Sequence, residues 1–242
     1  AKAIPGYIKT IQIDDPSKTC QGWLAVVAET YPAAIQAADL VQVQWNKGPR
    51  SAVNEADLQA ESLRLIEDAN AGALFVDDGD VDESIKAATT VIEQDFTTST
   101  VLHFQLEPVN AVAYEEDGHW HFHSGTQWQS LALPLLAQAM EVEQNAVTMH
   151  QYNLGGGFGR RLYADYLIPA GRVAKAMGKA VKMVFTRPDD AWLDCARSPT
   201  VQRMRSGIDS DGNLVSYEHH AACGWPIPGL APAFLYEAVK GT

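Results

Sequence analysis

Hydrophobic residues recur along the chain with two spacings, and the order of these spacings predicts mixed secondary structure. Apolar residues at every second position predict strands, whereas apolar residues three or four positions apart predict helices. In the first part of the chain the pattern predicts strands at 7–13, 24–28 and 41–45 and helices at 32–38 and 56–70. We therefore expect residues 1–78 to form a small α/β domain.

Strands become more frequent after residue 78. The pattern there predicts strands at 91–97, 111–115, 119–123, 146–152 and 180–185, a hairpin over 201–219, and helices at 128–140 and 163–177. Residues 79–242 are therefore expected to form a domain of mixed sheet and helices, and the fold class of the whole chain is α+β. The polar stretch 77–83 is the expected boundary between the two domains.

Turn-forming residues refine this prediction. The segments Glu115-Glu-Asp-Gly118 and Asp209-Ser-Asp-Gly212 predict tight hairpin turns, because Asp-Gly pairs readily adopt the backbone conformation of such turns. Pro169 and Gly171 fall inside the helix predicted at 163–177, so that helix is expected to kink or to begin late. The segment 186–190 is polar and is expected to be a loop.

The segment 154–161 reads Leu-Gly-Gly-Gly-Phe-Gly-Arg-Arg and follows the strand predicted at 146–152. Glycine has no Cβ atom, so such a turn can bring its backbone N–H groups close to a ligand. These groups, the positive end of the following helix dipole and the charges of Arg160 and Arg161 predict a site for a phosphate-like anion. The alternative is a purely structural turn whose arginines are solvated.

Two common glycine-loop patterns do not fit this segment. A dinucleotide fingerprint requires glycine at its sixth position, which is Arg160 when the count starts at Gly155. A nucleoside triphosphate loop ends in Gly-Lys-Ser or Gly-Lys-Thr, whereas this loop ends in Gly-Arg-Arg. A nucleotide-binding enzyme of an unrelated type is therefore the least favoured function.

The composition limits the classes of function. With 18 lysines and arginines against 30 aspartates and glutamates, the net charge is −12, which disfavours nucleic acids and anionic membranes as partners. No apolar run approaches the roughly 20 residues of a membrane-spanning helix. Cys20, Cys195 and Cys223 are far apart in the sequence, so buried thiols are expected rather than a disulfide framework or a zinc site.

Polar side chains at three places could contribute chemistry. His119, His121 and His123 share one face of a predicted strand, and because a row of side chains does not converge, a half-exposed polar face is favoured over a tetrahedral metal site. Gln127 either hydrogen-bonds an oxygen of a ligand or belongs to the start of a helix. Glu107 is either a general acid or base whose pKa is raised by burial, or a structural carboxylate that binds backbone N–H groups.

Three segments in this order resemble the molybdenum hydroxylases, the family of xanthine dehydrogenase and aldehyde oxidase. They are His103-Phe-Gln-Leu-Glu-Pro108, Gly125-Thr-Gln127 and Gly155-Gly-Gly-Phe-Gly159. The two arginines after the loop and the segments 186–190 and 197–199 are most similar to the branch of the isoquinoline 1-oxidoreductase beta subunit and membrane-associated aldehyde dehydrogenases. The resemblance extends over nearly the whole chain. It implies a small N-terminal domain followed by the first part of a molybdopterin-binding domain.

The resemblance implies roles for individual residues. Gln127 corresponds to the glutamine that hydrogen-bonds an oxo ligand of the molybdenum. Phe158 and Gly159, together with Gly156 and Gly157, correspond to the loop that lies against the metal centre and its pterin. The metal is held by the dithiolene sulfurs of the pterin, so no protein residue is expected to be a metal ligand.

Two further positions follow from the same resemblance. Arg160 is expected to meet the phosphate side of the cofactor. Leu162 occupies the place of a substrate-contacting glutamate of xanthine-type members, so an apolar N-heterocycle or an aldehyde is expected as substrate rather than a purine. The implied reaction hydroxylates an electron-poor carbon with oxygen derived from water, and electrons leave through iron-sulfur clusters on a partner subunit.

No residue of this chain is assigned as catalytic. The family's base is a glutamate in a Gly-x-Gly-Glu segment near the end of the full subunit, and the chain contains no such segment. We therefore expect a fragment of a catalytic large subunit that needs the rest of its subunit and is inactive alone. The alternative is a non-catalytic module of the same fold that binds another phosphate-bearing ligand or acts in assembly. The resemblance favours a periplasmic or membrane-associated location, with a cytoplasmic one as the alternative.

Overall fold

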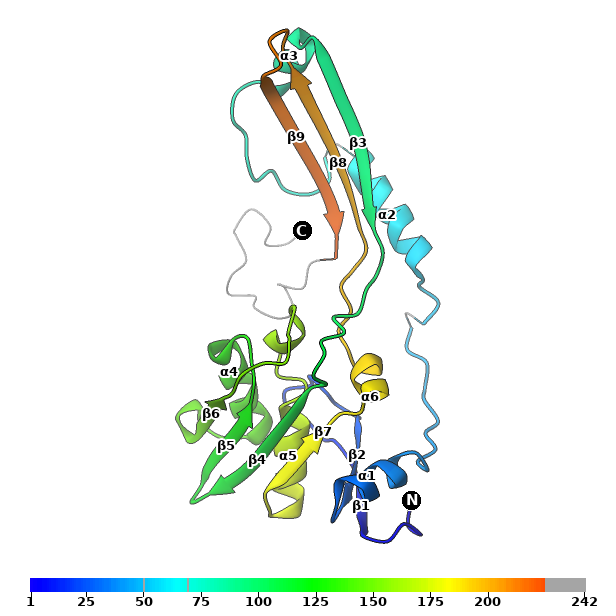
Figure 1. Cartoon of the computed structure of the whole chain (residues 1–242), viewed down its shortest axis with the longest axis vertical. Coiled ribbons are helices and arrows are strands. Elements are labelled where there is room, and N and C mark those ends of the chain that lie inside the picture. The colour runs from blue at the N-terminus through cyan, green and yellow to red at the C-terminus, as the bar shows by residue number, and fades with distance from the viewer. Residues whose placement is uncertain (50, 69, 225–242) are drawn as a thin grey trace. The chain divides into compact units, whose positions relative to one another are not determined.

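The computed structural model describes residues 1–49, 51–68 and 70–224, and these form an α+β protein (Figure 1). The chain divides into two compact units, each built from two segments. Unit 1 combines Ala1–Asn46 with His103–Cys195, and unit 2 combines Lys47–Leu102 with the residues from Ala196 onward. Each unit therefore joins parts of the chain that are distant in sequence.

Unit 1 begins with a two-stranded sheet and a short helix. The strands β1 (Tyr7–Gln12) and β2 (Leu24–Ala28) pair antiparallel. Helix α1 (Tyr31–Ala38) follows directly, because the Thr30 side chain accepts a hydrogen bond from the amide of Ala33 at the helix start. The helix packs back on β2.

The main sheet of unit 1 has the strand order β6-β5-β4-β7. The strands β4 (Asn110–Glu116) and β5 (His119–Ser124) form a hairpin, and β7 (Val181–Val184) pairs antiparallel with β4. The strand β6 (Val147–Gln151) is parallel to β5. The helix α4 (Gln129–Met140) and the 3₁₀ turn Gln144–Ala146 connect β5 to β6, as a parallel pair requires a crossover.

The core of unit 1 lies between one face of this sheet and two helices. Helix α4 and helix α5 (Ile168–Met177) bury apolar side chains against Phe122 and Met149 of the sheet. A Cβ atom at Gly171 would lie 2.7 Å from Phe122 Cζ and 2.8 Å from Met140 Sδ, so α5 can pack this closely only with glycine at that position. The close packing fixes the start of α5 and thereby the segment in front of it.

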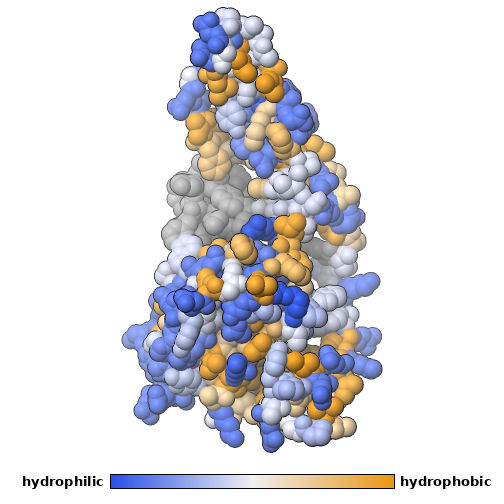
Figure 2. Space-filling model, viewed as in Figure 1, coloured by the Kyte–Doolittle hydropathy of each residue, from blue (hydrophilic) through white to orange (hydrophobic). Residues whose placement is uncertain are grey.

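Unit 2 contains a three-stranded antiparallel sheet in the order β3-β8-β9, which Figure 1 shows as three long strands side by side. The strands are β3 (Thr90–Thr98), β8 (Thr200–Ile208) and β9 (Leu214–Cys223). Helices α2 (Glu55–Glu67) and α3 (Val81–Ala87) pack on β8 and β9, where Ile66 joins a small buried cluster. On the face of this unit in Figure 2, hydrophobic residues are interspersed with hydrophilic ones.

Most of the predicted elements are present. The hairpin turns are confirmed, and Asp117, Gly118 and Gly212 adopt the left-handed backbone that such turns require. The helix expected at 163–177 begins late, at Ile168, with Pro169 in its first turn, where the missing N–H of proline does no harm. No helix among the described residues is both long and apolar enough to cross a bilayer.

Two local predictions were wrong. The strand expected at 41–45 does not form: the segment pairs with no described strand, and its apolar residues Val43 and Trp45 are 40% and 68% exposed instead of packing on one buried face. The loop expected at 186–190 is the start of helix α6 (Arg187–Trp192), in which Thr186 and Asp189 form a capping box. Helix α3 begins within the stretch 77–83, and the domain boundary expected there stays a prediction.

The thiol prediction holds in part. Cys20 is buried, and burial together with the nearby Asp15 carboxylate raises the pKa of its thiol. Cys195 and Cys223 are exposed, contrary to expectation, and all three are free cysteines. The division into domains 1–78 and 79–242 remains a prediction about the whole protein.

Candidate functional site

The glycine loop follows β6 in unit 1 and has a backbone that few residues other than glycine tolerate. Gly156, Phe158 and Gly159 have φ angles of +97°, +53° and +106°. A Cβ atom at Gly157 would lie 2.5 Å from Gln127 Oε1, and one at Gly155 would overlap the side chain of Glu107. Two of these glycines are therefore required by the close approach of other side chains, and two by the left-handed backbone.

Gln127 is the side chain that holds the outer part of the loop. Its Oε1 accepts hydrogen bonds from the amide of Gly159 at 3.0 Å and from the amide of Arg161 at 3.2 Å. The backbone N–H of Gln127 in turn donates to the carbonyl of Arg161 at 2.9 Å. With the side-chain oxygen engaged by the loop, the exposed Nε2 group remains the donor that Gln127 can offer to a ligand. The N-cap of α4 is Trp128, so Gln127 is not the capping residue.

Glu107 binds the inner part of the loop. Its carboxylate accepts from the amide of Gly155, from Arg161 Nη2, both at 2.8 Å, and from Asn110 Nδ2 at 3.0 Å. Partial burial raises the pKa of Glu107, but these three donors outweigh burial and hold the pKa below its ordinary value. A lowered pKa does not suit a general acid at neutral pH. The carboxylate binds the backbone amide of Gly155, as the structural reading predicts.

The two arginines after the loop are buried, contrary to both readings of the sequence. Neither guanidinium is solvated: Arg160 and Arg161 both have a relative exposure of 0%. Arg161 donates to the carbonyls of Gly156 at 3.0 Å and Glu107 at 2.9 Å. Arg160 Nη1 donates to Asp165 at 2.7 Å. These acceptors direct both guanidiniums into unit 1. This geometry does not support the expected contact of the Arg160 side chain with a cofactor phosphate.

A network of buried charges surrounds Arg160. Its Nε lies 3.3 Å from Asp194 Oδ1, close enough for an ion pair but without hydrogen-bond geometry, and Nε and Nη2 have no hydrogen-bond acceptor among the described residues. Asp190 is paired with Arg187 at 2.8 Å and accepts from Gln105 Nε2. Burial raises the pKa of Asp165, while the charge of Arg160 acts in the opposite direction. Charges buried this deeply are stable only while all partners remain in place.

His103 connects this network to the loop. Its Nδ1 bonds Asp194 Oδ1 at 2.9 Å, and its backbone amide donates to Asp194 Oδ2 at 2.8 Å. Its Nε2 lies 3.1 Å from the place where Gly159 would carry a Cβ atom. His103, Asp194 and Cys195 are also the one group of three potential metal ligands that come together in the described part of the chain. The charge of Arg160 beside Asp194 makes this an ion-pair cluster rather than a cation site.

The structure brings together most of the residues that the sequence singled out. Gln127 lies directly against the loop residues Gly157 and Gly159, and Phe158 projects with 63% of its surface exposed. Leu162 follows in a 3₁₀ turn (Arg160–Leu162) and is half-buried, with its amide bonded to the carbonyl of Gly159. The loop is thus followed by a 3₁₀ turn and not directly by the helix that was expected.

Sequence reasoning missed the residues that support the loop from within. Asp165 follows Arg160 closely in sequence, whereas Asp190 in α6 and Asp194 just after it are brought to Arg160 only by the fold. One available signal was the run of acidic residues after a strand, where Thr186 and Asp189 form a capping box. The histidines of β5 lie on the sheet face opposite the core and form a polar face, as expected.

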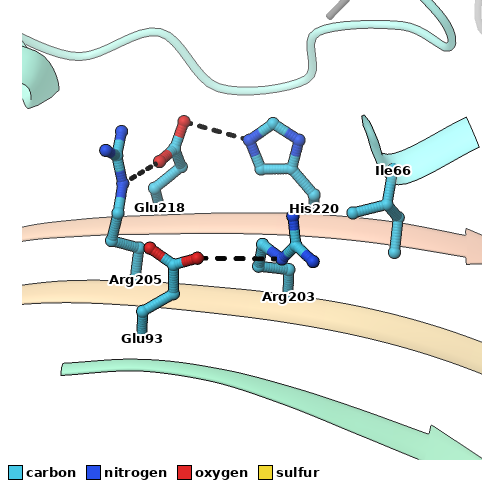
Figure 3. A pocket seen from close by; sticks show the side chains of 6 residues that line it. All are labelled: Ile66, Glu93, Arg203, Arg205, Glu218 and His220. Atoms are coloured by element: carbon cyan, nitrogen blue, oxygen red, sulfur yellow. Dashed lines mark hydrogen bonds and ion pairs between the residues drawn. The ribbon is translucent and has the colours of Figure 1, made fainter. Parts of the chain in front are cut away.

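Unit 2 has a separate pocket, lined by the residues Ile66, Glu93, Arg203, Arg205, Glu218 and His220 (Figure 3). Its charged side chains pair with one another: Arg205 Nε with Glu218 at 2.7 Å, and His220 with Glu218 at 3.0 Å. Arg203 is paired with Asp95 at 2.7 Å and with Glu67 at 2.9 Å. Because these charges already neutralise one another, the glycine loop of unit 1 is the stronger candidate site.

Comparison with known proteins bears on both units. The model of a molybdopterin cofactor-binding domain matches residues 66–238. The chain is 45% identical over all 242 residues to the "membrane-bound aldehyde dehydrogenase [pyrroloquinoline-quinone]" of Gluconacetobacter polyoxogenes, of which it covers 31%. It is 30% identical over 132 residues, or 54% of its length, to the isoquinoline 1-oxidoreductase subunit beta of Brevundimonas diminuta, of which the match covers 17%.

Among solved structures, an aldehyde oxidoreductase from Desulfovibrio gigas has a similar fold. The TM-score is 0.68 at 22% identity, and the match covers 91% of this chain and 28% of that one. A likeness at this identity shows the fold alone. The chain spans less than a third of the length of these three proteins.

Proposed function

This chain belongs to the family of molybdopterin cofactor-binding domains, and from this premise we propose that its glycine loop holds the cofactor of a molybdenum-dependent oxidoreductase. The observation that carries the proposal is the contact between Gln127 Oε1 and the amide of Gly159, which leaves the Nε2 donor of Gln127 beside the exposed Phe158. The proposal concerns the whole protein, of which this chain is one portion.

The residues of the loop fit such a group. A pterin with a phosphate tail needs a close approach to backbone, and the loop has glycine where a Cβ atom would meet Gln127 or Glu107. The amides of Gly156 and Gly157 donate to no acceptor among the described residues. Backbone N–H groups of this kind stabilise anions. The metal itself takes its sulfur ligands from the pterin, so the donor set of the protein need not contain cysteine or histidine.

Each loop residue has a proposed task. Gln127 Nε2 donates a hydrogen bond to an oxygen of the bound group, and Phe158 and Gly159 lie against that group. Gly156 and Gly157 offer their amides to its phosphate. Arg160 supports the loop without touching the bound group, because its ion pair with Asp165 holds the backbone that follows the loop. When bound, the cofactor would supply the chemistry that hydroxylates an electron-poor carbon with oxygen derived from water.

Substrate, partners and location are further parts of the proposal. Leu162 and Phe158 provide apolar surface beside the loop, which suits an aldehyde or an N-heterocycle better than a polar purine. The names of the relatives support the same two substrate classes. We propose an iron-sulfur partner subunit as the electron acceptor and a periplasmic or membrane-associated location for the whole protein. The remainder of its own subunit supplies the catalytic base.

The decisive experiment is cofactor analysis of the full-length protein, purified from a host that makes the molybdenum cofactor. We expect molybdenum and pterin in equal amounts. The name of one relative includes pyrroloquinoline quinone. This quinone is therefore measured in the same sample. A protein that contains the quinone and no molybdenum would overturn the proposal, and one that contains neither would favour the non-catalytic module.

The role of Gln127 is tested in the same preparation. Gln127→Ala removes a hydrogen-bond donor to the bound group, so the rate constant for aldehyde oxidation should fall by roughly 100-fold, a typical loss for one such donor. Gln129→Ala is the matched control, since Gln129 is exposed in the first turn of α4 and two residues away. Turnover that is equal in the two variants would remove Gln127 from the site.

A further inference from the structure

A second group of side chains in unit 1 lies outside the glycine loop and has no part in the proposed function. His119, His121 and His123 point away from the core, because they alternate with the buried Trp120 and Phe122 on β5. The sequence alone shows these three as a row that does not converge. The structure adds His150 of the neighbouring strand β6, which is directly opposite His123 in the parallel register.

Each histidine of β5 bonds a side chain of β6 or of Tyr152, the residue directly after it, so the strands are joined by three rungs. His119 Nε2 bonds Thr148 Oγ1 at 2.8 Å, and His123 Nδ1 bonds the hydroxyl of Tyr152 at 3.1 Å. In the middle rung, His121 Nδ1 and His150 Nε2 are 3.0 Å apart. Among the rungs of this ladder, the middle one alone joins two imidazoles, the ligands that copper, nickel and zinc ions prefer.

We propose that His121 and His150 form a binding site for a divalent transition-metal ion, with Cu²⁺ bound more tightly than Ni²⁺ or Zn²⁺. Two nitrogens that are each about 2.0–2.1 Å from one ion and 3.0 Å from each other subtend an angle of about 91–97° at the ion. Adjacent positions of a tetragonal Cu²⁺ or Ni²⁺ centre have this angle, whereas a tetrahedral Zn²⁺ centre needs a wider one. Water completes the coordination on the solvent side.

The rings are held in place but can adjust. The rings of His123 and His150 stack with centroids 4.1 Å apart and an interplanar angle of 13°, and those of Tyr114 and His121 stack at 4.9 Å. The centroids of His121 and His150 are 5.3 Å apart, so these two rings lie end to end around the shared contact. Both side chains are partly exposed, so a rotation of each ring about its Cβ–Cγ bond turns both lone pairs onto one ion.

The proton balance of this step is simple. In the metal-free pair, one neutral imidazole donates its N–H to the lone pair of the other. When the ion binds, the ring that donated the N–H carries its proton on its other nitrogen instead. Both facing nitrogens then become ligands, and no proton is lost. The surroundings favour a cation, since the exposed Glu116 is opposite His119 in the register and the chain has a net charge of −12.

The test measures metal binding to the full-length protein after treatment with a chelator. Equilibrium dialysis against Cu²⁺, with copper counted separately from molybdenum and iron, should show one equivalent that His150→Ala and His121→Gln weaken by roughly 10-fold or more. His119→Ala is the matched control, because His119 is on the same face and bonds a threonine. The electron paramagnetic resonance spectrum of bound Cu²⁺ should show coupling to two nitrogen nuclei. The copper-loaded protein should also melt at a higher temperature than the metal-free protein.

Three outcomes would overturn the proposal. The first is wild-type protein that binds no more copper than His150→Ala. The second is a loss in His119→Ala as large as that in His150→Ala, which would indicate diffuse binding by surface histidines. The third is a copper spectrum without coupling to two nitrogens. Circular dichroism of the metal-free variants shows whether they fold, and His150→Gln, which keeps a polar side chain in the ladder, replaces His150→Ala if the latter does not.

Discussion

Each unit of this protein contains a cluster of arginines and carboxylates, and the two clusters differ mainly in their access to water. In unit 1, the side chains of Arg160, Asp165 and Asp194 are 0%, 6% and 3% exposed. In unit 2, Arg203 of β8 pairs with Asp95 of β3 and Glu67 of α2 to form an exposed ladder, and Arg203 is 26% exposed. The distances are similar, at 2.7 Å for the shortest ion pair in each.

Similar distances therefore do not mean similar energies. A charge removed from water loses its hydration, so each buried partner depends on the others, and the loss of one leaves the rest uncompensated. An exposed pair exchanges hydration for a contact that is screened by salt and opposed by side-chain entropy. The buried cluster can hold a loop in a single conformation, whereas the exposed ladder mainly keeps the sheet surface polar.

The largest effect should come from breaking the buried cluster. Arg160→Ala leaves Asp165 and Asp194 as buried carboxylates without their cation, so the free energy of unfolding should fall by about 3–5 kcal/mol, measured by urea denaturation. Arg160→Lys keeps the charge but not the planar fork, so it should lose less. If Arg160→Ala does not yield folded protein, the loss in Arg160→Lys decides the question. A loss below that of a typical surface substitution would show that the cluster does not hold the fold.

The next effect concerns the loop that the cluster supports. Gly157→Ala places a Cβ atom 2.5 Å from Gln127 Oε1, so the loop or Gln127 must move, at a cost of about 1–3 kcal/mol in unfolding free energy. Gly48→Ala is the matched control, because nothing lies within 4 Å of its added Cβ and its backbone is not left-handed. That control should be neutral or slightly stabilising. Equal stability of the two variants would contradict the tight contact of Gln127 with the loop.

The elements around the loop could be predicted from sequence better than its interior. Strand β6, the late start of α5 and the hairpin turns all follow from local patterns of apolar residues, proline and glycine. The run of glycines also predicted a turn, and the family resemblance implied that Gln127 lies with it at one site. These features depend on residues close together in the chain, whose conformational preferences act locally.

The burial of Arg160 could not be predicted in the same way. Its partners Asp165, Asp190 and Asp194 are up to 34 residues away, and nothing in the local sequence distinguishes a buried guanidinium from a solvated one. His150 was missed beside His121 for the same reason, since only the parallel pairing of β5 and β6 brings them together. Chemistry that depends on long-range pairing becomes visible when the strand order is known.

A smaller effect is expected for Glu107, whose own side chain is 41% exposed but whose partner Arg161 is only 1% exposed. Its pKa in the folded protein is below its ordinary value near 4.5, so its contribution to stability is complete above that pH and is lost as the pH falls through the folded value. Glu107→Gln should therefore lower the melting temperature at neutral pH. Below pH 4.5, the melting temperature of the variant should fall less steeply than that of the wild type. Glu116→Gln, at an exposed position of β4, should leave the acid profile of the wild type unchanged.

The smallest effect is expected for Arg203→Ala in the exposed ladder. Asp95 and Glu67 raise the pKa of Arg203 through hydrogen bonds, but both carboxylates remain hydrated when the arginine is removed. The urea midpoint should therefore change only slightly at low salt, and the difference from wild type should vanish at about 1 M salt, where the screening length is about 3 Å. Arg160→Ala measured in the same salt series should keep its full loss, because ions do not reach the buried cluster. If instead Arg203→Ala lost as much stability as Arg160→Ala at high salt, exposure would not be what separates the two clusters.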